Sequence, residues 1–148
     1  MSVKPIPAGY HAVTPYLVVR NVSDEIEFLK KAFDAEVVLA VDSPDGIKHA
    51  EVKIHDSMIM LGMAQGGKKP TCTMLYLYVP DCDATFSKAM KAGGEVIVRP
   101  KDQYYGDRSG AVMDSNGNEW WIATHTEDLS PEEIAKRAKA AHKQTASV

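Results

Sequence analysis

Cysteine is scarce in this chain of 148 residues, since Cys72 and Cys82 are too few for a disulfide framework. Long apolar runs are missing too, and none approaches the roughly 18 residues that cross a bilayer, which excludes a membrane partner. The segment Met1–Pro7 lacks the apolar core of a signal peptide, so we expect a cytoplasmic protein. Positive charge is not in excess: the formal net charge of −3 argues against a nucleic-acid partner, because phosphate binding needs a basic face.

Two families of chemical motif are also absent. The glycine-rich cradles that hold nucleotide phosphates do not occur, and neither do the local signatures of serine or cysteine nucleophiles. What remains is an ordinary globular composition, with 45% hydrophobic and 25% charged residues. A length of 148 residues suits one domain with a real core, and we treat residues 1–148 as a single domain.

The chain repeats itself once. Tyr16–Val19 returns sixty residues later as Tyr76–Val79, and Asp56-Ser57 is echoed by Asp114-Ser115 before another apolar strand. A period of this length repeated twice is unlike a solenoid and indicates two copies of one supersecondary unit. We expect the two copies to share a sheet and to leave a pocket between them.

Periodicity and turn residues predict the order β-α-β-β-β in each copy. Module one covers about residues 10–62, a linker 62–70 and module two about 71–125; a C-terminal helix covers about 130–143. The predicted strands are 14–19, 36–41, 48–55, 58–62, 73–79, 95–98, 109–113 and 119–124, and the helices begin at Ser23, Asp83 and Ser130. We therefore expect an α+β fold in which a curved mixed sheet has helices on one side and a cleft on the other.

This pattern resembles the vicinal oxygen chelate superfamily, which includes glyoxalases, bleomycin-resistance proteins and dioxygenases, and within it the small PhnB-like proteins. The residues that carry the resemblance are Thr14–Leu17, Ala32–Glu36, Tyr105–Arg108, Asp114–Trp121 and Ile122–His125. The resemblance implies a homodimer, because many relatives build or complete their clefts at a dimer interface. The Gly62–Pro70 linker leaves open an exchange of modules between the two copies, which would give a domain-swapped dimer.

The resemblance also implies where a divalent metal would be held. Enzymes of the superfamily place ligands on the first and last strand of each module, and the matching positions here are Thr14, Met60, Met74 and Trp121. None is a usual ligand for such an ion, because threonine is a poor neutral donor, thioethers prefer soft metals and indole offers an N–H. We therefore expect neither a metal nor another cofactor.

The same positions suggest an apolar cleft for a small hydrophobic or aromatic molecule. Methionine adapts to irregular shapes, and tyrosine and tryptophan offer flat surfaces with polar edges. Packing within the sheet is an equal alternative for Met60 and Met74, whereas strand alternation favours Trp121 over Trp120 for the cleft. The predicted cleft residues are Thr14, Tyr16, His49, Glu51, Met58, Met60, Met74, Tyr76, Tyr105, Arg108 and Trp121.

Polar residues leave other functions open. His49 and Glu51 share a strand face, so a lyase, isomerase or dioxygenase with displaced metal ligands is an alternative. A metal-free enzyme is another, with His49 or Glu51 as the base and Arg108 holding an anion; alternatively, Arg108 pairs with a neighbouring aspartate. A third alternative is an interaction module that docks a partner through the helix at Ser130.

Overall fold

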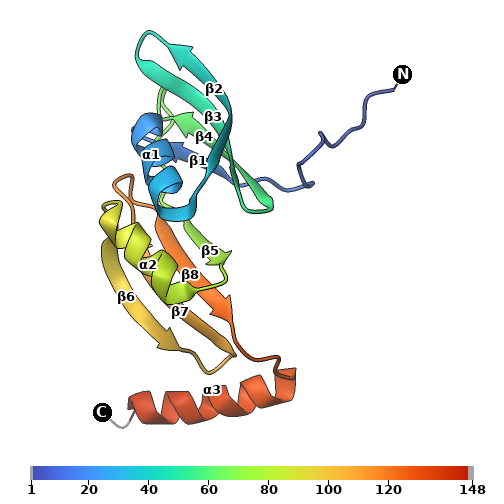
Figure 1. The fold of residues 1–148 in the computed structure, drawn as a ribbon, viewed down its shortest axis with the longest axis vertical. Coiled ribbons are helices and arrows are strands. Elements are labelled where there is room, and N and C mark those ends of the chain that lie inside the picture. The colour runs from blue at the N-terminus through green and yellow to red at the C-terminus, as the bar shows by residue number, and fades with distance from the viewer. Residues whose placement is uncertain (1, 147–148) are drawn as a thin grey trace.

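Residues 2–146 are described by a computed structural model and fold into eight strands and three helices (Figure 1). In chain order these are β1 (Tyr16–Val19), α1 (Val22–Phe33), β2 (Glu36–Ser43), β3 (Gly46–Ile54), β4 (Ser57–Met63), β5 (Met74–Tyr78), α2 (Cys82–Lys91), β6 (Glu95–Asp102), β7 (Asp107–Met113), β8 (Glu119–His125) and α3 (Pro131–Ala146). The predicted α+β class, the two β-α-β-β-β modules and the C-terminal helix are confirmed.

The eight strands form two mixed sheets of four strands each. The first sheet has the order β1-β4-β3-β2 and the second the order β5-β8-β7-β6. In both, the outer strand that precedes the helix runs parallel to the last strand of its module. This shared order is the structural form of the repeat in the sequence, and each sheet is complete within its own module.

One face of each sheet packs against a helix, and the two helices pack against each other where the modules meet (Figure 1). Leu17, Val52 and Leu61 are fully buried beneath α1, while α2 contributes Phe86 to the same core. Strand alternation then leaves the opposite face of each sheet without a helix. We call these the open faces of the first and second sheets, and the functional residues discussed below lie on them.

The Asp114–Asn118 turn joins the modules. Asn116 of this turn exchanges hydrogen bonds with the backbone of Asn21 and donates from Nδ2 to the Oε2 atom of Glu25, at 3.0 Å. Asp114 accepts the indole N–H of the buried Trp120 at 2.9 Å. The motif that carried the family resemblance therefore holds module two against the start of α1.

Most element boundaries differ from those predicted by one or two residues, and two of the differences have a clear physical cause. Helix α1 begins at Val22 because Asn21, not Ser23, is the cap, and its side chain accepts the backbone N–H of Asp24. Strand β6 continues through Pro100 to Asp102, where a loop was expected. A proline is tolerated there because β6 is an edge strand with a register shift between Val98 and Lys101.

The two chain ends lie outside the double module. The N-terminal arm projects away from the body, and α3 crosses the far end of module two (Figure 1). Ser130 caps α3 by accepting the N–H of Glu133, as the sequence predicts. Across residues 2–146, none of the helices combines the length and apolar content needed to cross a membrane.

Candidate functional site

On the open face of the first sheet, three side chains form a hydrogen-bonded chain. Tyr16 on β1 contacts His49 on β3, with 3.1 Å between the hydroxyl and Nδ1. The other ring nitrogen of His49 lies 3.1 Å from Oε2 of Glu51. Met60 lies between them in register, since it is paired with both Tyr16 and Glu51. This arrangement brings the predicted polar pair His49 and Glu51 next to the predicted aromatic surface of Tyr16.

On the open face of the second sheet, the predicted residues form a more aromatic surface. Met74 and Tyr76 follow each other along β5, and Tyr76 is paired with Trp121 on β8. The indole N–H of Trp121 faces Oε1 of Glu119 at 3.4 Å. Trp120 points the opposite way into the core, as alternation predicts. Met74 is 58% exposed, so this surface is open in the single chain.

A polar cluster lies at the end of this second open face. Asp107 is 3% exposed, and its carboxylate accepts hydrogen bonds from the hydroxyls of Tyr76 and Tyr78 at 2.7 and 3.0 Å. Its other oxygen lies 2.9 Å from Nδ1 of His125. Nε2 of His125 lies 2.7 Å from Asp128, whose side chain is fully exposed. The buried carboxylate of Asp107 therefore links Tyr76, Tyr78 and His125, and His125 extends the cluster to Asp128.

The contacts set the protonation states in this cluster. Burial would raise the pKa of Asp107, but the hydrogen bonds from His125, Tyr76 and Tyr78 outweigh it and hold the pKa below its ordinary value. Burial, followed by their hydrogen bonds, raises the pKa values of Tyr76 and Tyr78. Hydrogen bonds to Asp107 and Asp128 raise the pKa of His125. The contacts therefore stabilise the carboxylate form of Asp107, the neutral phenols of Tyr76 and Tyr78, and the charged form of the His125 imidazole.

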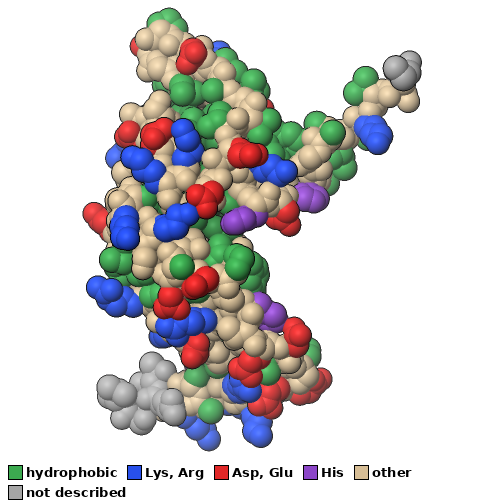
Figure 2. Space-filling view, in the orientation of Figure 1, with side chains coloured by type: hydrophobic (Ala, Val, Ile, Leu, Met, Phe, Trp, Pro, Cys, Tyr) green, Lys and Arg blue, Asp and Glu red, His purple; other side chains and the backbone are tan. Residues whose placement is uncertain are grey.

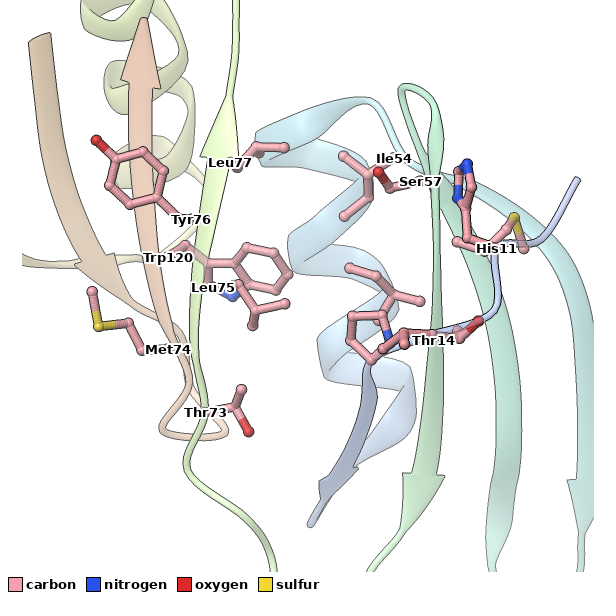
Figure 3. A pocket seen from close by; sticks show the side chains of 14 residues that line it. His11, Thr14, Ile54, Ser57, Thr73, Met74, Leu75, Tyr76, Leu77 and Trp120 are labelled. Carbon is pink, nitrogen blue, oxygen red and sulfur yellow. The ribbon is translucent and has the colours of Figure 1, made fainter. Parts of the chain in front are cut away.

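A cavity of about 350 Å³ lies where the modules meet, on the other side of β5 (Figure 3). Leu75, Leu77 and Trp120 point into it from module two, whereas the ring of Tyr76 points away toward the open face. Thr14 faces it from the N-terminal arm. The cavity is within the size range of small-molecule sites, and its wall is mostly apolar.

The structure separates the predicted cleft residues into groups. The first open face carries Tyr16, His49, Glu51, Met58 and Met60, and the second carries Met74, Tyr76 and Trp121 with Tyr105 at 3.4 Å between hydroxyls. Thr14, Met58, Met74 and Tyr76 also border the cavity between the modules. In one chain, therefore, these residues form two surfaces and not one enclosed cleft.

Arg108 is not brought to either open face. Its guanidinium makes a two-pronged contact with Asp83 at the start of α2, at 2.7 and 3.0 Å, and a longer one with Asp102. The bond from Arg108 lowers the pKa of Asp83. Arg108 therefore orders the helix side of the second sheet. Its position favours the alternative of an aspartate pair, with Asp83 as the partner, over the alternative in which it holds an anion for a metal-free enzyme.

The Asp107 cluster was missed as a unit from the sequence. Strand alternation through Asp107, Arg108 and Ser109 was the available signal, because Asp107 and Ser109 must face the side opposite Arg108. The pairing of Asp107 with His125 could not be predicted, because it depends on the register between β7 and β8.

The family metal positions do not fit a divalent ion. Thr14, Met60, Met74 and Trp121 supply a hydroxyl, two thioethers and an indole N–H, and the thioethers belong to different sheets. Within the described residues, no three His, Cys, Asp or Glu side chains are grouped so that they could hold a metal ion together.

Comparison with known proteins agrees with this architecture. Residues 10–122 match the model of the glyoxalase/bleomycin resistance protein/dioxygenase superfamily. An uncharacterized protein of Mycobacterium tuberculosis strain H37Rv is 36% identical over 135 residues, covering 83% of this chain and 79% of the relative. Among solved structures, TioX from Micromonospora sp. ML1 has a TM-score of 0.68 at 20% identity, covering 78% of this chain and 98% of that one. A glyoxalase-related enzyme from Fulvimarina pelagi has a TM-score of 0.64 at 17% identity, covering 77% and 87%.

The fold and the site together define a two-module β-α-β-β-β protein with open, partly aromatic sheet faces. This chain belongs to the glyoxalase/bleomycin resistance protein/dioxygenase superfamily.

Proposed function

We propose that this protein binds a small hydrophobic or aromatic molecule against its open sheet faces, without a metal at the usual family positions. The observation that carries the proposal is the second open face, where Met74 and Tyr76 are 58% and 39% exposed beside Trp121. Exposed aromatic and thioether groups in one surface are costly in water and favour flat apolar ligands. Sequestration or carriage fits this surface better than turnover.

We further propose that a second copy of the chain completes the cleft. Both open faces lack cover in one chain, and Tyr16 on the first and Tyr78 on the second are 47% and 56% exposed. Pairing the first face of one copy with the second face of the other would enclose the ligand between Met60 and Trp121. The linker between β4 and β5 permits the two copies to exchange whole modules, so the proposed dimer includes a domain-swapped form. We also propose that the chain belongs to the PhnB-like branch of the superfamily.

Soaking crystals of the protein with planar aromatic molecules tests the binding function. We expect electron density for the ligand against Trp121, and about a tenfold loss of affinity in Trp121→Ala, since a buried aromatic contact is worth about 1–2 kcal/mol. Met90→Ala is the matched control, because Met90 is an exposed apolar residue on α2 away from both open faces. A ligand bound far from Trp121 and Met60 would overturn the proposal.

A second candidate function is a metal-dependent lyase, isomerase or dioxygenase with displaced ligands. The observation in its favour is the contact of His49 and Glu51 on the first open face, at 3.1 Å. Elemental mass spectrometry after incubation with divalent ions and desalting would distinguish the two functions. Near one metal per chain, lost in His49→Ala, would favour the enzyme, whereas less than a tenth of an equivalent would favour metal-free binding.

A further inference from the structure

The tyrosines at the end of the second open face form two walls of a cage. The rings of Tyr76 and Tyr78 lie 5.3 Å apart between centroids and are inclined by 65°. Both are accessible, at 39% and 56% exposure. Tyr105 joins them through its hydroxyl group, which lies 3.4 Å from that of Tyr76. Inclined, exposed aromatic faces of this kind attract cations through the negative potential above each ring.

The hydroxyl groups strengthen this preference. Tyr76 and Tyr78 both donate to Oδ2 of Asp107, so their hydrogens point inward toward the buried carboxylate. Because the Tyr76 hydroxyl donates to Asp107, it accepts from the hydroxyl of Tyr105 at 3.4 Å and keeps one lone pair, while the oxygen of Tyr78 keeps both. These remaining lone pairs can accept N–H donors. At the hydroxyl ends of the two rings lies the negative charge of Asp107, which is 3% exposed and poorly screened. The surface toward solvent is thus a set of electron-rich acceptors.

The neighbouring histidine does not reverse the local charge. His125 is held between Asp107 and Asp128, with one carboxylate at each ring nitrogen, at 2.9 and 2.7 Å. Even when His125 is protonated, its single positive charge against the carboxylates of Asp107 and Asp128 leaves a net charge of −1 in this group. An anionic ligand would have to displace Asp128 to reach His125, whereas a cation can approach the exposed tyrosine rings directly.

We propose that Tyr76, Tyr78 and Tyr105, backed by Asp107, form a subsite for a cationic amine, so that the ligand is an aromatic or apolar molecule with a basic nitrogen. This inference rests on the proposed binding function and names the chemistry of the ligand. The apolar part of the ligand lies along Met74 and Trp121, and its ammonium group lies over the rings of Tyr76 and Tyr78.

Three probes with the same benzyl body and different heads test the subsite: benzyltrimethylammonium, benzyl alcohol and benzoate. Ligand-observed NMR titration measures their affinities for the full chain. We expect the ammonium probe to bind about five- to tenfold more tightly than the alcohol, and benzoate to bind most weakly. Tyr78→Leu should abolish the preference, whereas Tyr78→Phe should keep most of it because the ring remains.

Asp107→Asn should also reduce the preference for the ammonium probe; if this variant fails to fold, the two Tyr78 variants still decide. Equal binding of ammonium and alcohol, both lost in Trp121→Ala, would overturn the cation subsite and leave the apolar cleft standing. Tightest binding of benzoate would overturn it in favour of an anion at His125. Absence of binding by all three probes would overturn the subsite together with the proposed function.

Discussion

Glu25 is the residue whose environment departs most from the ordinary. It lies on α1, is 0% exposed, and its Oε1 atom has no hydrogen-bond partner among the described residues. Burial and the proximity of the Asp114 carboxyl group raise the pKa of Glu25 to about 9, although the hydrogen bond from Asn116 opposes the shift. A neutral carboxyl group therefore sits where the two modules meet.

This environment predicts a pH-dependent stability. In the unfolded chain the carboxyl releases its proton near pH 4.5, whereas the native state keeps it until about pH 9. Stability from this group is complete below pH 4.5 and is lost as the pH rises through that window, at up to about 1.4 kcal/mol per unit. We expect Glu25→Gln to flatten the decline of the free energy of unfolding between pH 5 and pH 8.5.

Urea unfolding at a series of pH values measures this effect. Glu27→Gln is the matched control, because Glu27 is exposed on the same helix and pairs with Lys30 at 3.6 Å. The control should retain the slope of the unmodified protein. If the free energy of unfolding of Glu25→Gln declined with pH as steeply as that of the unmodified protein, the carboxyl group of Glu25 would not be neutral in the native state.

At the scale of elements, the β6–β7 turn anchors α3 to module two. The carbonyl of Gly106 accepts the backbone N–H groups of Thr126 and Glu127, at 2.8 and 3.0 Å. Gly106 has a φ of 93°, and a Cβ atom there would lie 2.6 Å from the Glu127 carbonyl oxygen. The segment leading to α3 therefore fits against this turn because residue 106 has no side chain.

Gly106→Ala should destabilise the protein by about 2–4 kcal/mol, because the left-handed backbone and a backbone clash are both unfavourable. Gly46→Ala is the control: its φ is 113°, yet no atom lies within 4 Å of the added Cβ. It should cost about 1 kcal/mol through backbone strain alone. Denaturant unfolding measures the losses, and hydrogen exchange should show faster exchange in α3 for Gly106→Ala. Equal losses in the two variants would mean that α3 moves aside without cost.

At the scale of elements, residue patterns predict a strand or helix clearly wherever one of its faces is buried. Alternation in β3 placed Ala50, Val52 and Ile54 in the core and His49 and Glu51 opposite, as the structure confirms. It could not show that β6 passes through Pro100, because tolerance of proline depends on β6 being an edge strand. The cap at Asn21 was missed because Ser23 is equally acceptable by residue type, and which side chain reaches a free N–H depends on where the chain turns.

For the whole molecule, the two open faces lead to the proposed dimer. Surfaces of large apolar side chains seldom remain uncovered in a monomer. We expect a mass of two chains at micromolar concentration in sedimentation or light-scattering measurements. Met74→Glu should shift the equilibrium to the single chain, because it places a charge in the covered face.

Met90→Glu serves as the control for the dimer, since Met90 is 37% exposed on α2 and should leave the mass unchanged. A monomer at all concentrations in the unmodified protein would contradict the completed cleft. A dimer that Met74→Glu leaves intact would mean that the copies meet through another surface.

By itself, the sequence determined the duplication, the β-α-β-β-β order, the buried faces and the replacement of the family metal ligands by Thr14, Met60, Met74 and Trp121. Local periodicity and side-chain chemistry encode these features, so they can be read along the chain. Only the tertiary structure decided that Arg108 pairs with Asp83. The same holds for the contacts of Asp107 with His125 and two tyrosines, and for the hydrogen bond from Asn116 to the buried Glu25. Those contacts depend on strand register and on how the modules pack, because they join residues from 18 to 91 positions apart.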